Sequence, residues 1–400
     1  MRSADLLRLV VLLVVAGCGG GGGGSTKPGG GTTGADNVLA LSVNGKLCRA
    51  TPGYPNKPCV QVTVCTPGTS QCQTIDDILL DTGSYGLRVF RQALGSVTLQ
   101  QVAAGSGALA TCVQFADQTS DWGPVQMADV VLGGEPAVRV PIHVLDSTFS
   151  TAPSSCPNPE TGPSVAGFNG ILGLGVFAQD CGPGCAGTSS NGIYFSCSAS
   201  GCTDSAAPIS DQVSNPVALL PLDNNGVIVD LPAVAEGGAP SVEGTLLLGI
   251  GTRSNNTLTG ATAIPVSPFN GTFTTSLGGV DLSHSFLDTG SNGLFFAPPS
   301  PTVLPACAGN ASSWFCPTAT VSLTATNKAD AGSPSADVSF QIANFESLAA
   351  SSNSVFPNLG GGSLAGAGFD WGLPFHLGRR VAVGFEARSS SLGAGPLVAF

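Results

Sequence analysis

Two aspartates that could act together in acid–base catalysis stand in nearly identical contexts, 207 residues apart. Asp81 and Asp288 each begin the pattern D-T-G-S-x-G-L, and a leucine precedes both of them. Two carboxyl groups a few ångströms apart cannot both ionise at moderate pH, so they share a proton. One can then activate a water molecule while the other acts as general acid. The spacing, about one domain length, predicts a duplicated unit that brings the two carboxyls face to face.

The residues around each aspartate suit a loop that presents a carboxylate. Apolar runs at 78–80 and 286–287 predict buried strands leading into the loops. In each copy we expect the threonine to lock the two loops together and the glycine to bring backbone amides close to the carboxylate. The serine can hydrogen-bond the aspartate beside it. A single D-T-G is an ordinary turn sequence, so the prediction depends on the matched pair. The supporting residues are Thr82, Gly83, Ser84, Thr289, Gly290 and Ser291.

Composition narrows the fold class and the choice of partners. The chain has 42% hydrophobic residues, enough for a large core, together with 56 glycines and 29 prolines. Because it lacks long stretches of helical periodicity, we expect an all-β protein of two lobes. A net charge of −11 argues against nucleic acid as a partner. Only three distant histidines and no C-x-x-C motif are present, so we expect no metal and no cofactor. The histidines, expected to be structural or on the surface, are His143, His284 and His376.

The N-terminus has the pattern of an export signal. Arginines precede an apolar run at 9–16 that is too short to span a bilayer. The run ends in V-A-G-C, which resembles a bacterial lipobox, and this predicts a signal peptide at 1–17 and lipidation of Cys18. Ordinary cleavage just before that cysteine is the alternative. A Gly-rich tether would follow at 18–37. Gly19 is not the aspartate associated with inner-membrane retention, so we expect a lipid anchor in the bacterial outer membrane, facing the periplasm or the surface.

The cysteine count points to an oxidising compartment. Thirteen cysteines are present, and setting Cys18 aside leaves twelve, an even number that suggests six disulfides. Spacing alone does not determine connectivity. Close neighbours in the sequence favour Cys181–Cys185, Cys197–Cys202 and Cys307–Cys316. Three further candidates, which the spacing leaves open, are Cys65–Cys72, Cys48–Cys59 and Cys112–Cys156.

A more specific resemblance appears further along the chain. Residues 168–175 read F-N-G-I-L-G-L-G, which resembles the F-D-G-I-L-G-L segment that packs behind the first D-T-G loop of pepsin-like aspartic proteases. Residues 371–375 and 381–385 resemble the strand that closes the psi-loop of that family. The resemblance extends, unevenly, from about residue 38 to the C-terminus. With the D-T-G-S pair, the chain looks closest to bacterial secreted lipoproteins that carry this duplicated motif.

The resemblance implies a bilobal pepsin-like fold with two related β-barrel-like lobes, at 38–225 and 226–400. Asp81 and Asp288 would face each other across the cleft between the lobes. It further implies a monomeric aspartic-type endopeptidase that hydrolyses peptide bonds by carboxylate-activated water. Its substrate would be a peptide or protein held in the cleft, and the reaction would involve neither a metal nor a covalent intermediate.

The chain also departs from the family pattern. The flap of pepsin-like proteases carries a tyrosine next to a glycine, and the corresponding segment 115–123 has none. Trp122 could close over the cleft in its place, or could pack on the sheet as a hairpin aromatic. Gly372-Leu373 replaces the usual Gly-Asp, and no basic propeptide is evident. These departures favour a second hypothesis, a lipid-anchored binding or envelope-structural protein without turnover, whereas the intact D-T-G-S pair favours the enzyme.

Lipidation at Cys18 is directly testable. Wild-type protein should incorporate labelled palmitate and sediment with membranes, because acyl chains transfer into the bilayer. Cys18→Ser should lose both the label and the membrane association in the same bacterial host. A Cys18→Ser protein that still labels and sediments would contradict the assignment, and unlabelled wild type would favour ordinary cleavage.

Overall fold

Over its described residues the chain is all-β, with a closed barrel of six strands and a half-barrel, an architecture compatible with two lobes. None of the helices described is both long and apolar enough to cross a membrane. Cys18, the predicted signal peptide and all but the last two residues of the predicted tether lie outside the described residues. The computed structural model describes residues 36–115, 119–363 and 368–400.

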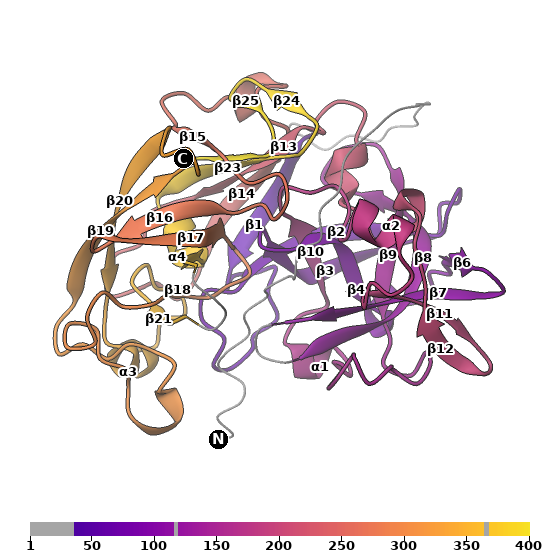
Figure 1. Ribbon diagram of the computed structural model, residues 1–400, viewed down its shortest axis with the longest axis horizontal. Helices are drawn as coiled ribbons and strands as arrows, with labels where there is room; N and C mark the ends of the chain where they lie inside the picture. Colours follow the sequence, from indigo (N-terminus) through magenta and orange to yellow (C-terminus); the bar gives the residue numbers. More distant parts are fainter. Residues whose placement is uncertain (1–35, 116–118, 364–367) are drawn as a thin grey trace.

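Two groups of strands lie side by side, one coloured violet to magenta and the other mostly orange (Figure 1). The larger sheet contains β1 (Val38–Val43), β2 (Pro58–Cys65), β3 (Cys72–Asp81), β4 (Tyr85–Phe90), β5 (Gln100–Gln101), β6 (Ala103–Ala104), β7 (Gly107–Gln114), β8 (Ser120–Val131), β9 (Val138–Leu145), β10 (Gly170–Leu174), β11 (Tyr194–Ser198), β12 (Gly201–Asp204), β13 (Gly226–Leu231), β14 (Val242–Leu248), β15 (Ala263–Pro265), β23 (Arg379–Gly384) and β26 (Leu397–Ala399).

The smaller sheet has the order β20-β19-β16-β17-β22-β18-β21. Its strands are β16 (Phe273–Leu277), β17 (Val280–Leu287), β18 (Leu294–Phe296), β19 (Val321–Lys328), β20 (Ser335–Ile342), β21 (Gly360–Gly362) and β22 (Asp370–Trp371). A separate ribbon pairs β24 (Ser389–Ser390) with β25 (Gly393–Ala394). The short helices are α1 (Pro163–Ala166), α2 (Pro183–Gly187), α3 (Phe345–Ala349) and α4 (Leu373–His376), with 3₁₀ turns at Arg91–Leu94, Ile209–Asp211, Pro216–Leu219, Ser254–Asn256 and Gly309–Ala311.

Alternation of apolar and polar residues explains why these segments form strands. In β2, Val60, Val62 and Val64 are fully buried, whereas Gln61 is exposed. Successive side chains of a strand point to opposite faces, so this period of two buries one face in the core. The run that leads into Asp81 is buried on both faces, because Ile78 and Leu80 pack into one apolar cluster and Leu79 into another.

Strand pairing joins the two halves of the chain. β1 pairs with β14 along its whole length, from Val38 opposite Leu247 to Val43 opposite Val242. β14 also pairs with β13, and β13 pairs with β23. The larger sheet therefore crosses the boundary predicted at residue 225, and the two halves share a set of strands behind the D-T-G-S loops.

The same strand arrangement surrounds each aspartate. β3 pairs in parallel with β10, which is antiparallel to β4. β17 pairs in parallel with β22, which is antiparallel to β18. In the first copy Gly173 lies opposite Asp81. In the second copy the last paired residues are Trp371 and Leu287, and Leu287 is the residue directly before Asp288. The repeat seen in the sequence therefore corresponds to a repeat in topology.

All six predicted disulfide pairings are confirmed, including the three that the spacing left open. Their sulfur atoms lie at bonding distance, between 1.94 and 2.08 Å apart. Five of the bridges close short loops, and the sixth, Cys112–Cys156, spans 44 residues. Bridges of this kind restrict the unfolded chain, and long loops gain most from them in the chain-entropy account.

Trp122 is part of the core. Its side chain is 1% exposed and packs edge-on against Phe195, with 5.7 Å between ring centroids. Its Nε1–H donates a hydrogen bond to the carbonyl of Ser150 at 3.1 Å. These contacts favour packing on the sheet over closing above a cleft, the two alternatives that the sequence left open. The tip of the same hairpin, 116–118, lies outside the described residues.

Truncation of Trp122 should therefore affect stability first. We expect Trp122→Ala to lower the free energy of unfolding by about 3–5 kcal/mol, because it leaves a large cavity and removes a buried hydrogen bond. Chemical denaturation monitored by circular dichroism measures this, with Trp122→Phe as a milder control that keeps an aromatic ring. A variant that unfolds at the same denaturant concentration as wild type would contradict the core assignment.

Candidate functional site

Two threonines hold the D-T-G-S loops against each other. The backbone N–H of Thr82 donates to Thr289 Oγ1, and the backbone N–H of Thr289 donates to Thr82 Oγ1, both at 3.0 Å. Each hydroxyl then donates across to the opposite strand: Thr82 to the carbonyl of Leu287 at 3.0 Å, and Thr289 to that of Leu80 at 2.7 Å. Both threonines are buried. The predicted locking role of the threonines agrees with this reciprocal arrangement.

The first loop surrounds the Asp81 carboxylate with donors. The backbone N–H of Gly83 donates to Oδ1 at 2.8 Å, and the hydroxyl of Ser84 donates to Oδ2. Segment 170–175 lies behind the loop, where the backbone N–H of Gly175 donates to the carbonyl of Ser84 at 2.9 Å. The loop therefore orients the carboxylate, and the residue that follows β10 holds the loop in place.

The second loop repeats the arrangement and adds a donor. The backbone N–H groups of Gly290 and Ser291 donate to Asp288 Oδ1, at 2.8 and 3.1 Å. The Ser291 hydroxyl lies 2.9 Å from Asp288 Oδ2. It also lies 2.7 Å from Oδ2 of Asp370, a third buried carboxyl group. Each serine hydrogen-bonds the aspartate of its own loop, but only Ser291 also contacts a second carboxyl group.

The glycine that follows the threonine in each copy lies against the carboxylate of the other copy. A Cβ atom on Gly83 would come within 2.6 Å of Asp288 Cγ. A Cβ atom on Gly290 would come within 2.9 Å of Asp81 Cγ and 3.1 Å of Asp288 Oδ1. Both carboxylates therefore lie against the same glycine, in close mutual contact. Glycine is required at both positions because any side chain would displace a carboxylate.

Burial determines the electrostatics of the pair. Asp81 and Asp288 are both 0% exposed. Burial raises the pKa of Asp81, while hydrogen bonds and the positive charge of Arg88 offset part of the rise. Burial also raises the pKa of Asp288 well above its usual value, and the nearby carboxyl groups of Asp81 and Asp370 raise it further. The pair therefore retains a shared proton to higher pH than two solvated carboxyl groups would.

Arg88 and Asp370 make the two halves of the site unequal, and sequence reasoning missed both. Arg88 is fully buried, with its guanidinium 3.1 Å from Asp180 and 2.8 Å from His143 Nδ1. Asp180 in turn accepts a hydrogen bond from the Tyr194 hydroxyl. In both cases a charged residue stands within an apolar stretch of the sequence, and this pattern could have identified the position. His143 is thus structural, as predicted.

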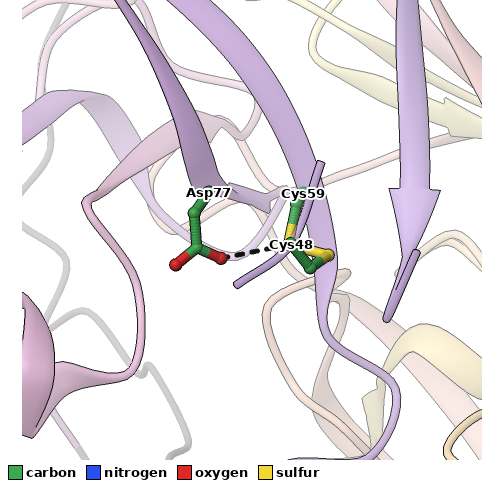
Figure 2. Close-up of side chains that lie close together, drawn as sticks. All are labelled: Cys48, Cys59 and Asp77. Carbon is green, nitrogen blue, oxygen red and sulfur yellow. Dashed lines mark hydrogen bonds between the residues drawn. A yellow bond between two sulfur atoms is a disulfide. The ribbon is translucent and has the colours of Figure 1, made fainter. Parts of the chain in front are cut away.

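Two cysteines and a carboxylate form a compact group elsewhere (Figure 2). Ligand-type atoms of Cys48, Cys59 and Asp77 lie within 4.8 Å of one another, but the cysteines form a disulfide. Disulfide sulfurs are not thiolate ligands, and Asp77 is paired with the buried ammonium of Lys57 at 2.7 Å. Burial lowers the pKa of Lys57 and raises that of Asp77, and the pairing opposes both shifts. The group is therefore a structural bridge and not an open donor set for a metal ion.

A family model described as "Protein of unknown function (DUF3443)" matches residues 33–400. The chain belongs to the DUF3443 family. Among curated proteins, none matches it. The matched residues include both D-T-G-S loops, the disulfide-linked segments and Asp370.

In this DUF3443 chain, the interlock should contribute strongly to stability. Thr82→Val should lower the free energy of unfolding by about 1–3 kcal/mol for each buried backbone group left without a partner, here the carbonyl of Leu287 and the N–H of Thr289. Thr82→Ser keeps the hydroxyl and is the matched control. Urea denaturation of Thr82→Val, Thr289→Val and the double variant measures the effect. Additive losses would contradict a reciprocal interlock, because its two halves should be strongly coupled.

Proposed function

We propose that this protein is an aspartic-type endopeptidase on a pepsin-like scaffold, with Asp81 and Asp288 as its catalytic pair. The observation that carries the proposal is the reciprocal geometry of the two loops. Each loop locks the other through a threonine, and each presents its carboxylate to the glycine of the other copy. A duplicated loop with this symmetry places two carboxyl groups around one position, which is what shared-proton chemistry requires.

The surroundings of the two carboxyl groups differ and suggest a role for each, because Arg88 favours the charged form of Asp81 and Asp370 opposes that of Asp288. Asp81, the more readily ionised, would take a proton from a water molecule as that water attacks the peptide carbonyl. Asp288, which keeps its proton, would donate it to the carbonyl oxygen as the tetrahedral species forms. As that species collapses, Asp81 would give its newly acquired proton to the leaving amine nitrogen, and Asp288 would take back a proton from a diol hydroxyl, which restores both groups to their starting states. Ser84 and Ser291 would keep the two carboxylates in the plane that this transfer needs.

The same assignment predicts the shape of the pH profile. Activity would fall at low pH when Asp81 becomes protonated, and at high pH when Asp288 loses its proton. Because burial raises the pKa of both groups, the profile would extend to higher pH than a pair of solvated carboxyls allows. Activity into the weakly acidic range follows from this.

Complete burial of both carboxylates supports a second candidate function. Since Asp81 and Asp288 are 0% exposed, a substrate reaches them only after the covering segments move. A binding or envelope-structural protein on the same scaffold would need no such movement. Under either function we propose a monomer anchored in the bacterial envelope through Cys18, with peptide or protein as the ligand of the enzyme and no nucleic-acid partner.

A peptide digest tests the proposal. Purified protein should cleave a mixed peptide library between about pH 3 and pH 7, with products identified by mass spectrometry. Asp81→Asn and Asp288→Asn should each lower the rate by several orders of magnitude while folding normally, because neither carboxyl can replace the other. A statine-type peptide should inhibit, since its hydroxyl mimics the tetrahedral species.

The controls distinguish the alternatives. Asp337→Asn makes the same chemical change at an exposed strand position and should leave cleavage unaffected. Cleavage that survives either dyad substitution would move the chemistry elsewhere in the molecule. Folded wild type that cleaves nothing over the whole pH range would favour the binding or structural function.

A further inference from the structure

Asp370 is a buried carboxyl group that the two-aspartate mechanism does not use. It lies in β22, next to the strand that carries Asp288, and is 4% exposed. Its Oδ2 atom lies 2.7 Å from the hydroxyl oxygen of Ser291. Its Oδ1 atom is buried and has no hydrogen-bond partner among the described residues. One oxygen of Asp370 therefore contacts the site, and the other is shielded from water.

Comparison of the two copies shows that the fold does not need a carboxyl group at this position. Asp370 lies opposite Phe286 of β17 and opposite Phe295 of β18. The corresponding residue of the first copy is Ile171, opposite Leu79 of β3 and Arg88 of β4. Ile171 is fully buried in an apolar cluster. The first copy satisfies the same topology with an apolar side chain, so the carboxyl group of Asp370 requires another explanation.

The number of protons available around Ser291 provides an explanation for the carboxyl group of Asp370. The Ser291 hydroxyl has a single hydrogen, yet its oxygen lies at hydrogen-bond distance from carboxyl oxygens of both Asp288 and Asp370. An ionised carboxylate only accepts hydrogen bonds. For each contact to be a full two-centre hydrogen bond and not half of a bifurcated one, one of the two carboxyl groups must be protonated and donate to Ser291. Two short contacts, at 2.9 and 2.7 Å, favour such a proton in addition to the hydroxyl hydrogen.

The surroundings indicate which carboxyl group carries it. The Asp81 and Asp288 carboxyls are hydrogen-bonded to each other and share their proton between them, and Asp288 Oδ1 accepts two backbone N–H groups, so Asp288 accepts from Ser291 rather than donating to it. Asp370 has a single contact, and its other oxygen is buried without a partner. The titratable groups that face it are Asp288 and Asp81; the negative charge of Asp81 opposes ionisation of Asp370, and β17 and β18 place phenylalanines opposite it. Burial raises the pKa of Asp370 well above its usual value, in agreement with this assignment.

We propose that Asp370 is a positioning residue of the dyad, which remains protonated, donates to Ser291 and so directs the Ser291 hydroxyl onto Oδ2 of Asp288. The Asp288 carboxyl is then held on both sides, by backbone N–H groups on Oδ1 and by Ser291 on Oδ2. The catalytic consequence rests on the proposed function, whereas the proton on Asp370 does not. The experiment therefore has one arm that needs no activity.

Thermal unfolding as a function of pH tests the proton. A carboxyl group whose pKa is raised in the folded protein stabilises the fold at low pH, and this contribution is lost as pH rises toward the folded pKa. The amide introduced by Asp370→Asn does not titrate, so this variant loses no stability from that position as pH rises. The melting temperature of the variant minus that of wild type should therefore increase by about 2 °C or more between about pH 4 and pH 8. Asp337→Asn, an exposed change in the same sheet, is the control. A difference that stays constant or reverses would overturn the proposal.

Peptide hydrolysis tests the positioning role. Asparagine can still donate to Ser291 from its Nδ2, and leucine cannot. We therefore expect Asp370→Asn to have at least about 10-fold higher kcat/KM than Asp370→Leu, with the difference mainly in kcat. Equal losses in the two variants, with dyad-dependent cleavage in wild type, would overturn the positioning role and leave the proposed function intact. If wild type does not cleave, the proposed function fails, and the unfolding measurement still decides whether Asp370 carries the proton.

Discussion

The interlock of Thr82 and Thr289 is the interaction on which the site depends. Two buried hydroxyl groups satisfy two backbone N–H groups and two carbonyls of opposite loops. Buried backbone groups without partners are costly, so neither loop can keep its conformation without the other. The close approach of the carboxylates follows, because each loop must bring its glycine against the aspartate of the other copy. Electrostatic repulsion between two buried carboxyls is thereby opposed by hydrogen bonds that do not involve the carboxyls.

The duplicated framework is symmetric, but its charges are not. At equivalent strand pairs, the first copy has Arg88 with Ile171 and the second has Phe295 with Asp370. A cation therefore lies near Asp81 and an additional acid near Asp288. This difference gives two otherwise similar carboxyls unequal electrostatic surroundings, which the proposed acid–base chemistry would use. A buried arginine needs partners of its own, which explains the network of Asp180, His143 and Tyr194 behind β4.

Much of the local structure could be predicted from the sequence. The repeated L-D-T-G-S-x-G-L, the apolar runs before it and the segment 168–175 predicted strands, loops and their duplication, because those features depend on short-range patterns. Trp122 illustrates the limit, since a tryptophan in a hairpin looks the same whether it faces a cleft or a core. Asp370 is a second case: it lies 82 residues from Asp288 in the sequence, and only the parallel pairing of β17 with β22 brings it to Ser291.

A buried dyad raises the question of which contacts would have to give way for a ligand to reach it. On one side, β1 and β14 are paired over six residues and join the two halves in one sheet. On the other, Asn56 donates from Nδ2 to the carbonyl of Asn292, beside the second D-T-G-S loop, and exchanges hydrogen bonds with the backbone of Phe356. Each such bond contributes only about 0.5–1.5 kcal/mol net. Opening at Asn56 therefore costs less than separation of the shared sheet, provided that the Thr82–Thr289 interlock stays closed. The Lys57–Asp77 pair and the Cys48–Cys59 bridge would keep the Asn56 loop attached to the first copy during such an opening.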